Sequence, residues 1–114
     1  MVNITASKTI NALKITGTGQ TVGGNALTTL TLTAAGVAVT GGTDTINVPI
    51  LAFAANQAIF HVNSGSTLNL NSTLSGSAGF VKADGGTLVL NAPANDQGIA
   101  NTTANTSLSG TYNL

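Results

Sequence analysis

The 114-residue chain has almost no charge and no cysteine. Charged side chains make up 5% of it, against about 25% in an ordinary domain. Its net charge of zero provides no basic surface for nucleic acid or an anionic membrane. Without cysteine it can form neither a disulfide framework nor a thiolate metal site. Because so weakly charged a surface has little colloidal repulsion, we expect the chain to associate with its own kind.

Helix-forming residues and long apolar runs are also scarce. Arginine and glutamate are absent and methionine occurs once, whereas threonine favours strands, and asparagine and glycine favour turns. The longest apolar run, near 48–55, contains Pro49 and is too short to span a bilayer. A hydrophobic content of 42% argues against disorder. We therefore predict an all-β fold without membrane insertion.

One motif occurs twice in the chain. Gly65–Asn71 and Gly85–Asn91 both read Gly-x-Thr-Leu-x-Leu-Asn, so the second copy follows the first at an offset of 20 (85 minus 65). A fixed period of this length is typical of a solenoid, in which each repeat is one coil stacked on the last. The best repeats are predicted at 59–78 and 79–96, and the segment 94–107 is expected to be irregular.

We predict a single domain, residues 1–114, folded as a right-handed parallel β-helix with about five coils of roughly 20 residues. An antiparallel β-sandwich of similar strands is the alternative, because alternating patterns alone do not settle topology. Window 50–58 is ambiguous and is predicted as strand and corner, since no helix cap frames it. The predicted core ladder, in which partners share the same offset of 20, consists of Leu68, Leu70, Leu88, Leu90, Phe60 and Phe80, and the predicted corner ladder consists of Asn71 and Asn91.

Residues 75–91 resemble a known family. They read Ser-Gly-Ser-Ala-Gly-Phe-Val-Lys-Ala-Asp-Gly-Gly-Thr-Leu-Val-Leu-Asn, which is similar to the autotransporter-associated β-strand repeat, approximately Ser-Gly-x-Gly-x-x-x-Lys-x-Gly-x-Gly-Thr-Leu-x-Leu. The match is good over 74–91 and looser over 13–48. It departs at Asp84, where the family usually has glycine, and in 94–106, which lacks a Tyr-Thr-Gly-Gly element. The resemblance implies a β-helical passenger or large bacterial surface protein and no specific activity.

The sequence argues against an enzyme. His61 is the only histidine, and no Gly-x-Ser-x-Gly elbow accompanies it, so we expect it to point out of its strand. Asp44, Asp84 and Asp96 are dispersed, and the calcium-binding repeat Gly-Gly-x-Gly-x-Asp is absent. We predict no catalytic, cofactor-binding or metal-binding residue.

A self-associating structural protein is the first of two functional hypotheses. An uncapped β-helix exposes unpaired strand edges that template pairing with another chain. We therefore predict an extracellular subunit on a bacterial surface that forms a fibre or layer and can adhere to a host surface or polysaccharide. A passenger-domain fragment of an autotransporter adhesin is the alternative. Residues 1–5 lack the pattern of a signal peptide, so we expect either that a leader has been removed or that the chain is a piece of a longer protein. The predicted self-association residues are Val2, Ile4, Thr111, Tyr112 and Leu114.

A binding module is the second hypothesis. The alternating segment Thr29–Thr33 places Thr29, Thr31 and Thr33 on one side of a strand. A flat array of hydroxyl and methyl groups suits ice or a crystalline polysaccharide. Such an array needs the same threonine pair in successive coils, and the sequence repeats only Thr67 and Thr87.

Overall fold

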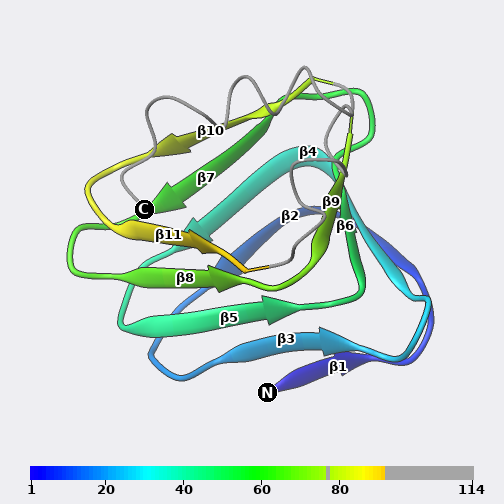
Figure 1. Ribbon diagram of the computed structural model, residues 1–114, viewed down its shortest axis with the longest axis horizontal. Coiled ribbons are helices and arrows are strands. Elements are labelled where there is room, and N and C mark those ends of the chain that lie inside the picture. The colour runs from blue at the N-terminus through cyan, green and yellow to red at the C-terminus, as the bar shows by residue number, and fades with distance from the viewer. Residues whose placement is uncertain (77, 92–114) are drawn as a thin grey trace.

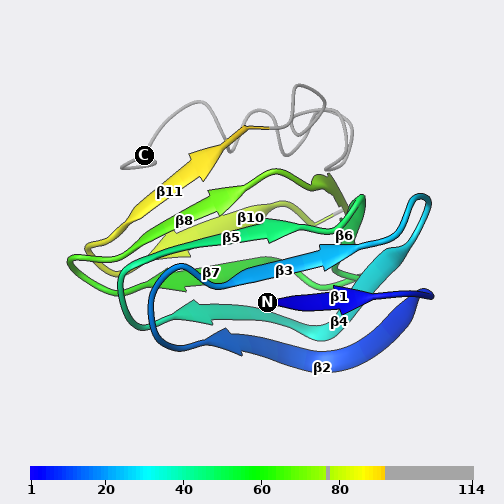
Figure 2. The same cartoon turned by 90° about the horizontal axis from the view of Figure 1, so that it is seen from below.

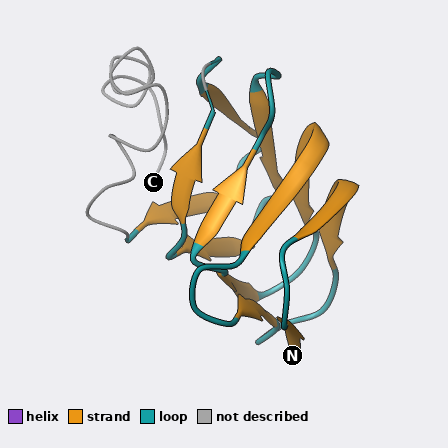
Figure 3. Ribbon diagram, turned by 90° about the vertical axis from the view of Figure 1, so that its right-hand side faces the viewer, coloured by secondary structure: helices purple, strands orange, loops and turns teal. Residues whose placement is uncertain are grey.

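A computed structural model describes residues 1–76 and 78–91. These residues form short strands and no helix, as Figure 1 and Figure 3 show. The strands are β1 (Val2–Ile4), β2 (Lys8–Ile15), β3 (Thr21–Gly24), β4 (Thr29–Val39), β5 (Thr43–Asn47), β6 (Ile50–Ala52), β7 (Ala58–Val62), β8 (Thr67–Leu70), β9 (Thr73–Ser75), β10 (Phe80–Ala83) and β11 (Thr87–Leu90).

The strands stack as a parallel β-solenoid of about four turns, slightly fewer than the five predicted. Every strand pair among the described residues is parallel, which rules out the antiparallel sandwich. In Figure 1 the chain crosses the near side from left to right along β3, β5 and β8, returns behind along β4 and β7, and climbs at each turn. This path is right-handed, the hand that parallel crossovers adopt almost without exception.

Each full turn has three faces. Face 1 is the five-stranded sheet β1-β3-β5-β8-β11. Face 2 contains the first parts of β2 and β4 together with β6 and β9, and face 3 contains the last parts of β2 and β4 together with β7 and β10. The chain bends between faces 2 and 3 within β4, where Ala35 has a positive φ of 56°. The ambiguous window also follows the prediction, because β6 is a strand that ends at a corner.

The spacing between turns varies along the stack. On face 1, Val2 pairs with Val22 and Thr67 pairs with Thr87, offsets of 20, but Thr43 pairs with Thr67, an offset of 24. The strand segments stay in register because each must pair with the turn below. The corners carry the difference in length, as surface connections readily do.

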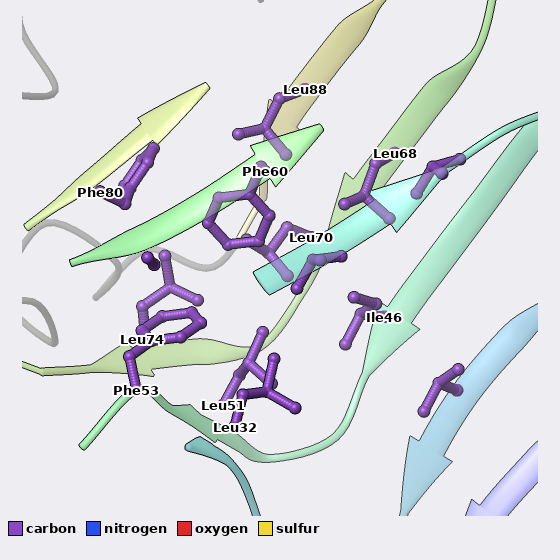
Figure 4. Close-up of a cluster of buried hydrophobic side chains, with 14 of the residues drawn as sticks. Leu32, Ile46, Leu51, Phe53, Phe60, Leu68, Leu70, Leu74, Phe80 and Leu88 are labelled. Carbon is purple, nitrogen blue, oxygen red and sulfur yellow. The ribbon is translucent and has the colours of Figure 1, made fainter. Parts of the chain in front are cut away.

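The leucine ladder has the register that the repeat predicts. Leu68 pairs with Leu88 and Leu70 pairs with Leu90, and the first three of these side chains are fully buried. Figure 4 shows them within the cluster of apolar side chains that fills the solenoid. The corner ladder also forms, since the Asn91 side-chain amide donates a hydrogen bond to Asn71 Oδ1 at 2.8 Å.

The predicted stacking of Phe80 on Phe60 is wrong in register. Lys82 pairs with Phe60, so the offset on face 3 is 22 (82 minus 60). The corner leading to face 1 is therefore shorter in the last turn, and Asp84 makes this tighter bend with a positive φ of 70°. Glycine adopts that conformation freely and aspartate tolerates it, so the backbone explains why a repeat of this kind can carry glycine there.

The two rings still meet inside the solenoid. Phe60 and Phe80 lie edge to face with their centroids 5.4 Å apart, and Phe53 packs on Phe60 in the same way at 5.7 Å. Figure 4 shows the three rings at one side of the core. Such geometry is the favourable one for aromatic pairs, so the contact survives the shift in register.

The two glycines of the second motif copy have different roles. The Gly86 amide donates to the Val62 carbonyl oxygen at 2.7 Å, and Gly86 itself is buried. A β-carbon added to Gly86 would collide with the carbonyl oxygens of Val62 and Asn63. One added to Gly85 would make an ordinary contact of 3.6 Å with Ser64 Cβ.

We expect Gly86→Ala to lower the free energy of unfolding by about 1–3 kcal/mol, the cost of overpacking a filled core. Gly85→Ala serves as the matched control and should change it by less than about 1 kcal/mol. Urea unfolding followed by circular dichroism measures both values. Equal losses in the two variants would contradict the close approach of the chain at Gly86.

Candidate functional site

Side chains that could together hold a metal ion do not gather in the described part of the chain. Residues 1–76 and 78–91 contain no cluster of three or more His, Cys, Asp or Glu side chains that could hold a metal ion. No helix with the length and hydrophobicity of a membrane span occurs among these residues either. The candidate sites are therefore surfaces of the solenoid and one buried carboxylate.

His61 points outward from β7, as its alternation with buried neighbours predicts. Its Nδ1 lies 3.2 Å from Asp84 Oδ2, a contact that sequence reasoning did not foresee. The two side chains are 50% and 43% exposed. Exposed pairs of this kind contribute little to stability, so the pair is a feature of the surface of face 3.

Asp44 is buried, which the sequence analysis missed. It is 1% exposed and occupies the core position that Leu68 and Leu88 occupy in the next two turns. Its Oδ1 accepts a hydrogen bond from the backbone amide of Gln20 at 2.8 Å. In the turn below, the residue next to Asp44 is Gln20, which lies in the loop just before β3 and not in a strand. The Asp44 side chain therefore supplies an acceptor for the backbone amide of this loop residue.

A second repeat would have revealed this position. Thr43–Asn47 reads Thr-Asp-Thr-Ile-Asn, and at an offset of 24 (67 minus 43) Thr67–Asn71 reads Thr-Leu-Asn-Leu-Asn. The first threonine, the apolar residue at the fourth position and the final asparagine recur. Asp44 stands at the second position, where the later segment has Leu68. A search at one fixed offset of 20 does not detect this match.

The first turn leaves apolar core positions open to solvent. Val2 is 57% exposed, whereas Val22 and Ile46, which follow it on face 1, are 8% and 0% exposed. Ile10 is 36% exposed, whereas its partner Leu32 is fully buried. The hydrophobic core therefore continues to an uncovered end at β1 and β2, which we call the first-turn end.

Only some of the predicted self-association residues lie at this end. Val2 and the partly buried Ile4 belong to β1, which is an edge strand of face 1 among the described residues. Thr111, Tyr112 and Leu114 lie outside the described residues, as does the segment 94–107. The predicted single domain of residues 1–114 and the repeat at 79–96 also extend past the described part of the chain.

The outer surface of face 3 is unexpectedly apolar. Ile59 and Val81 point outward and are 39% and 41% exposed. Beside them, Ala12–Lys14 of β2, Gly36–Ala38 of β4 and His61 line a shallow hollow of about 230 Å³. Adjacent apolar residues in a strand lie on opposite faces, so pairs such as Ile59 and the buried Phe60 are the sequence signal for a strand that is apolar on both sides.

Threonines form a ladder on face 1 rather than at the predicted place. Thr43, Thr67 and Thr87 pair in three successive turns. The partners of Thr31 on face 2 are Thr9 and Ala52, so that array is not repeated. Thr33 lies near the corner, where its hydroxyl donates to the Ile10 carbonyl oxygen at 3.3 Å.

Comparisons of the chain with protein-family models, curated proteins and solved structures found no match.

The role of Asp44 can be tested by two substitutions. Asp44→Ala leaves the Gln20 amide without its acceptor and opens a small cavity, so we expect a loss of about 1–3 kcal/mol in the free energy of unfolding. Asp44→Asn keeps an acceptor of the same shape and should retain most of the stability. Urea unfolding measures the difference, and equal losses would show that the hydrogen bond to Gln20 contributes nothing.

Proposed function

We propose that this protein is an extracellular structural subunit that associates with copies of itself by stacking solenoids end to end. The supporting observation is the first-turn end, where Val2 and Ile10 occupy core positions and remain exposed. A coil of another copy whose strands paired with β1 and β2 would cover these side chains and satisfy the outer edges of both strands. This mode of association is the addition of a strand to an open sheet edge.

Stacking continues the interactions that already hold one turn on the next. Burying a valine or isoleucine side chain completely contributes about 1.5–3 kcal/mol, and part of that amount remains available at the first-turn end. β2 adds an edge of eight residues on faces 2 and 3. The partner surface belongs at the opposite end of the stack, of which β11 is the last described strand on face 1.

The resemblance of residues 75–91 to the autotransporter-associated repeat supports a place on the bacterial surface, with adhesion to a host surface or polysaccharide as a further role. A passenger-domain fragment of an autotransporter adhesin is the alternative, in which further coils of the same chain would cover the first-turn end. A chain with 5% charged residues also has little repulsion to oppose contact between copies.

Placing a charge at the first-turn end should block stacking. We expect Val2→Lys to lower the association constant by about tenfold or more, because a lysine at a sheet edge disfavours pairing with another strand. Thr45→Lys, on the outer surface of face 1, is the matched control. Sedimentation velocity and electron microscopy report the size of the assemblies. A wild-type chain that stays monomeric at all accessible concentrations would refute end-to-end stacking, as would unchanged assembly of Val2→Lys.

A binding module is a second candidate because of the threonine ladder on face 1. Thr43, Thr67 and Thr87 present hydroxyl and methyl groups at the spacing of adjacent strands, about 4.8 Å. Thr21 and Thr45 form a shorter column beside them. A periodic surface of this kind favours a solid ligand with its own repeat, such as ice or a crystalline polysaccharide.

The ladder predicts different effects for two threonine substitutions. Thr67→Tyr interrupts the ladder and should abolish any gap between the melting and freezing points of ice, and any binding to insoluble polysaccharide. Thr31→Tyr introduces the same side chain on face 2 and should leave both unchanged. If neither activity is measurable in the wild-type chain, or if both variants lose it equally, the ladder is not a binding surface.

A further inference from the structure

The outer surface of face 3 is uneven, because its first two turns carry small residues apart from Lys14 and its last two turns carry larger ones apart from Ala83. Figure 2 shows its four strands β2, β4, β7 and β10 in successive turns. The strand pairing places outward residues in two columns. The first column is Ala12, Gly36, Ile59 and Val81, and the second is Lys14, Ala38, His61 and Ala83.

The first two turns of this face contain the hollow described above. Its volume is about 230 Å³ and it lies over β2 and β4, next to His61. The last two turns carry Ile59 and Val81, whose side chains stand out from β7 and β10. A hollow and a projecting apolar ridge therefore lie side by side on the same flat face.

We infer that face 3 binds face 3 of a second copy through a two-fold axis that runs along the strands. Such an axis keeps each column opposite itself and reverses the order of the turns. Val81 of one copy then lies over Ala12 of the other, and Ile59 lies over Gly36. Each projecting side chain meets a glycine or an alanine, and the ridge of each copy enters the hollow of the other, as an isologous interface requires.

Charge points to the same arrangement. Lys14 lies on the first turn of face 3, and Asp84 follows Ala83 on the last. Reversing the turns brings each Lys14 next to the Asp84 of the other copy, so two opposite-charge contacts form. A two-fold axis along the stack would instead place the two Lys14 side chains on the same level, and it would set hollow against hollow.

The contact is small for a single pair of chains. Four turns at about 4.8 Å and four residues at about 3.3 Å give a face of roughly 250 Å², whereas a stable interface buries about 800 Å² on each partner. One pair should therefore bind weakly. In a stack of many subunits the contact repeats along its length, and avidity makes it strong. The avidity of face 3 in a long assembly therefore rests on the proposed end-to-end stacking. The pairing of two face 3 surfaces does not depend on that stacking.

The absence of cysteine from the chain permits a direct test of orientation. In the inferred pair, Lys14 of one copy lies opposite Ala83 of the other. We expect a mixture of Lys14→Cys and Ala83→Cys chains to form disulfide-linked dimers on mild oxidation. Neither variant should do so alone, because identical positions lie about three turns, or roughly 14 Å, apart, and a disulfide needs Cα atoms within about 7 Å.

Ile59→Lys tests whether the apolar ridge of face 3 is needed for the contact. Combined with the two cysteine variants, it should lower the yield of linked dimers by at least about tenfold, whereas Thr45→Lys on face 1 should leave the yield unchanged. The inference is overturned if the mixture forms no linked dimers, if either cysteine variant links to itself equally well, or if Ile59→Lys has no effect. The first and last of these outcomes would leave face 3 free for another ligand.

The same assay separates this inference from end-to-end stacking. Adding Val2→Lys to both cysteine variants removes the proposed stacking contact and leaves face 3 intact. Linked dimers that persist in this background support the face 3 contact even where no long assemblies form. Loss of the linked dimers there, with Thr45→Lys unaffected, would show that the cross-link depended on the first-turn end and would overturn the contact.

Discussion

Parallel backbone pairing between successive turns is the constraint on which the rest of the structure depends. Each strand segment must lie in register with the segment one turn below, so a residue shares its environment with its partners in the same column. Val2, Val22 and Ile46 face inward together. Differences in chain length are confined to the corners, where Ala35 and Asp84 adopt positive φ values. The core is therefore regular although the period varies.

This constraint explains what the sequence could predict. The leucine and asparagine ladders follow from the repeated motif because the last two turns on face 1 have the same offset as its two copies. The predicted pairing of Phe80 with Phe60 was wrong because the offset on face 3 is 22. The shorter corner at Asp84 is visible only in the backbone conformation. Asp44 was missed for a related reason. Its turn repeats at an offset of 24, so a search at an offset of 20 does not place it in the column of Leu68, on the same side of β5 as the buried Ile46.

The same geometry makes the surfaces of the solenoid hard to anticipate. Alternation identifies which residues face the core, but it does not reveal which outward residues become neighbours, since these come from different turns and are distant in the chain. Gly36 and Ile59 are inconspicuous in sequence, yet pairing sets them side by side on face 3. For the same reason, the sequence shows the recurrence of Thr67 and Thr87 at an offset of 20 but does not reveal Thr43 as the third member of their column. Surface pattern in a solenoid is a property of register.

The two proposed contacts use the solenoid in different directions. Stacking at the first-turn end extends the solenoid along its axis and depends on backbone edges and exposed core positions. These features do little to fix the orientation of one copy relative to the other. Pairing through face 3 lies across the axis, and its orientation is set by side-chain size and by Lys14 and Asp84. Because the inferred pair reverses the order of the turns, a stack would meet a neighbour that runs the other way. A chain with few charges thus needs only one opposite-charge contact, repeated by symmetry, to select that arrangement.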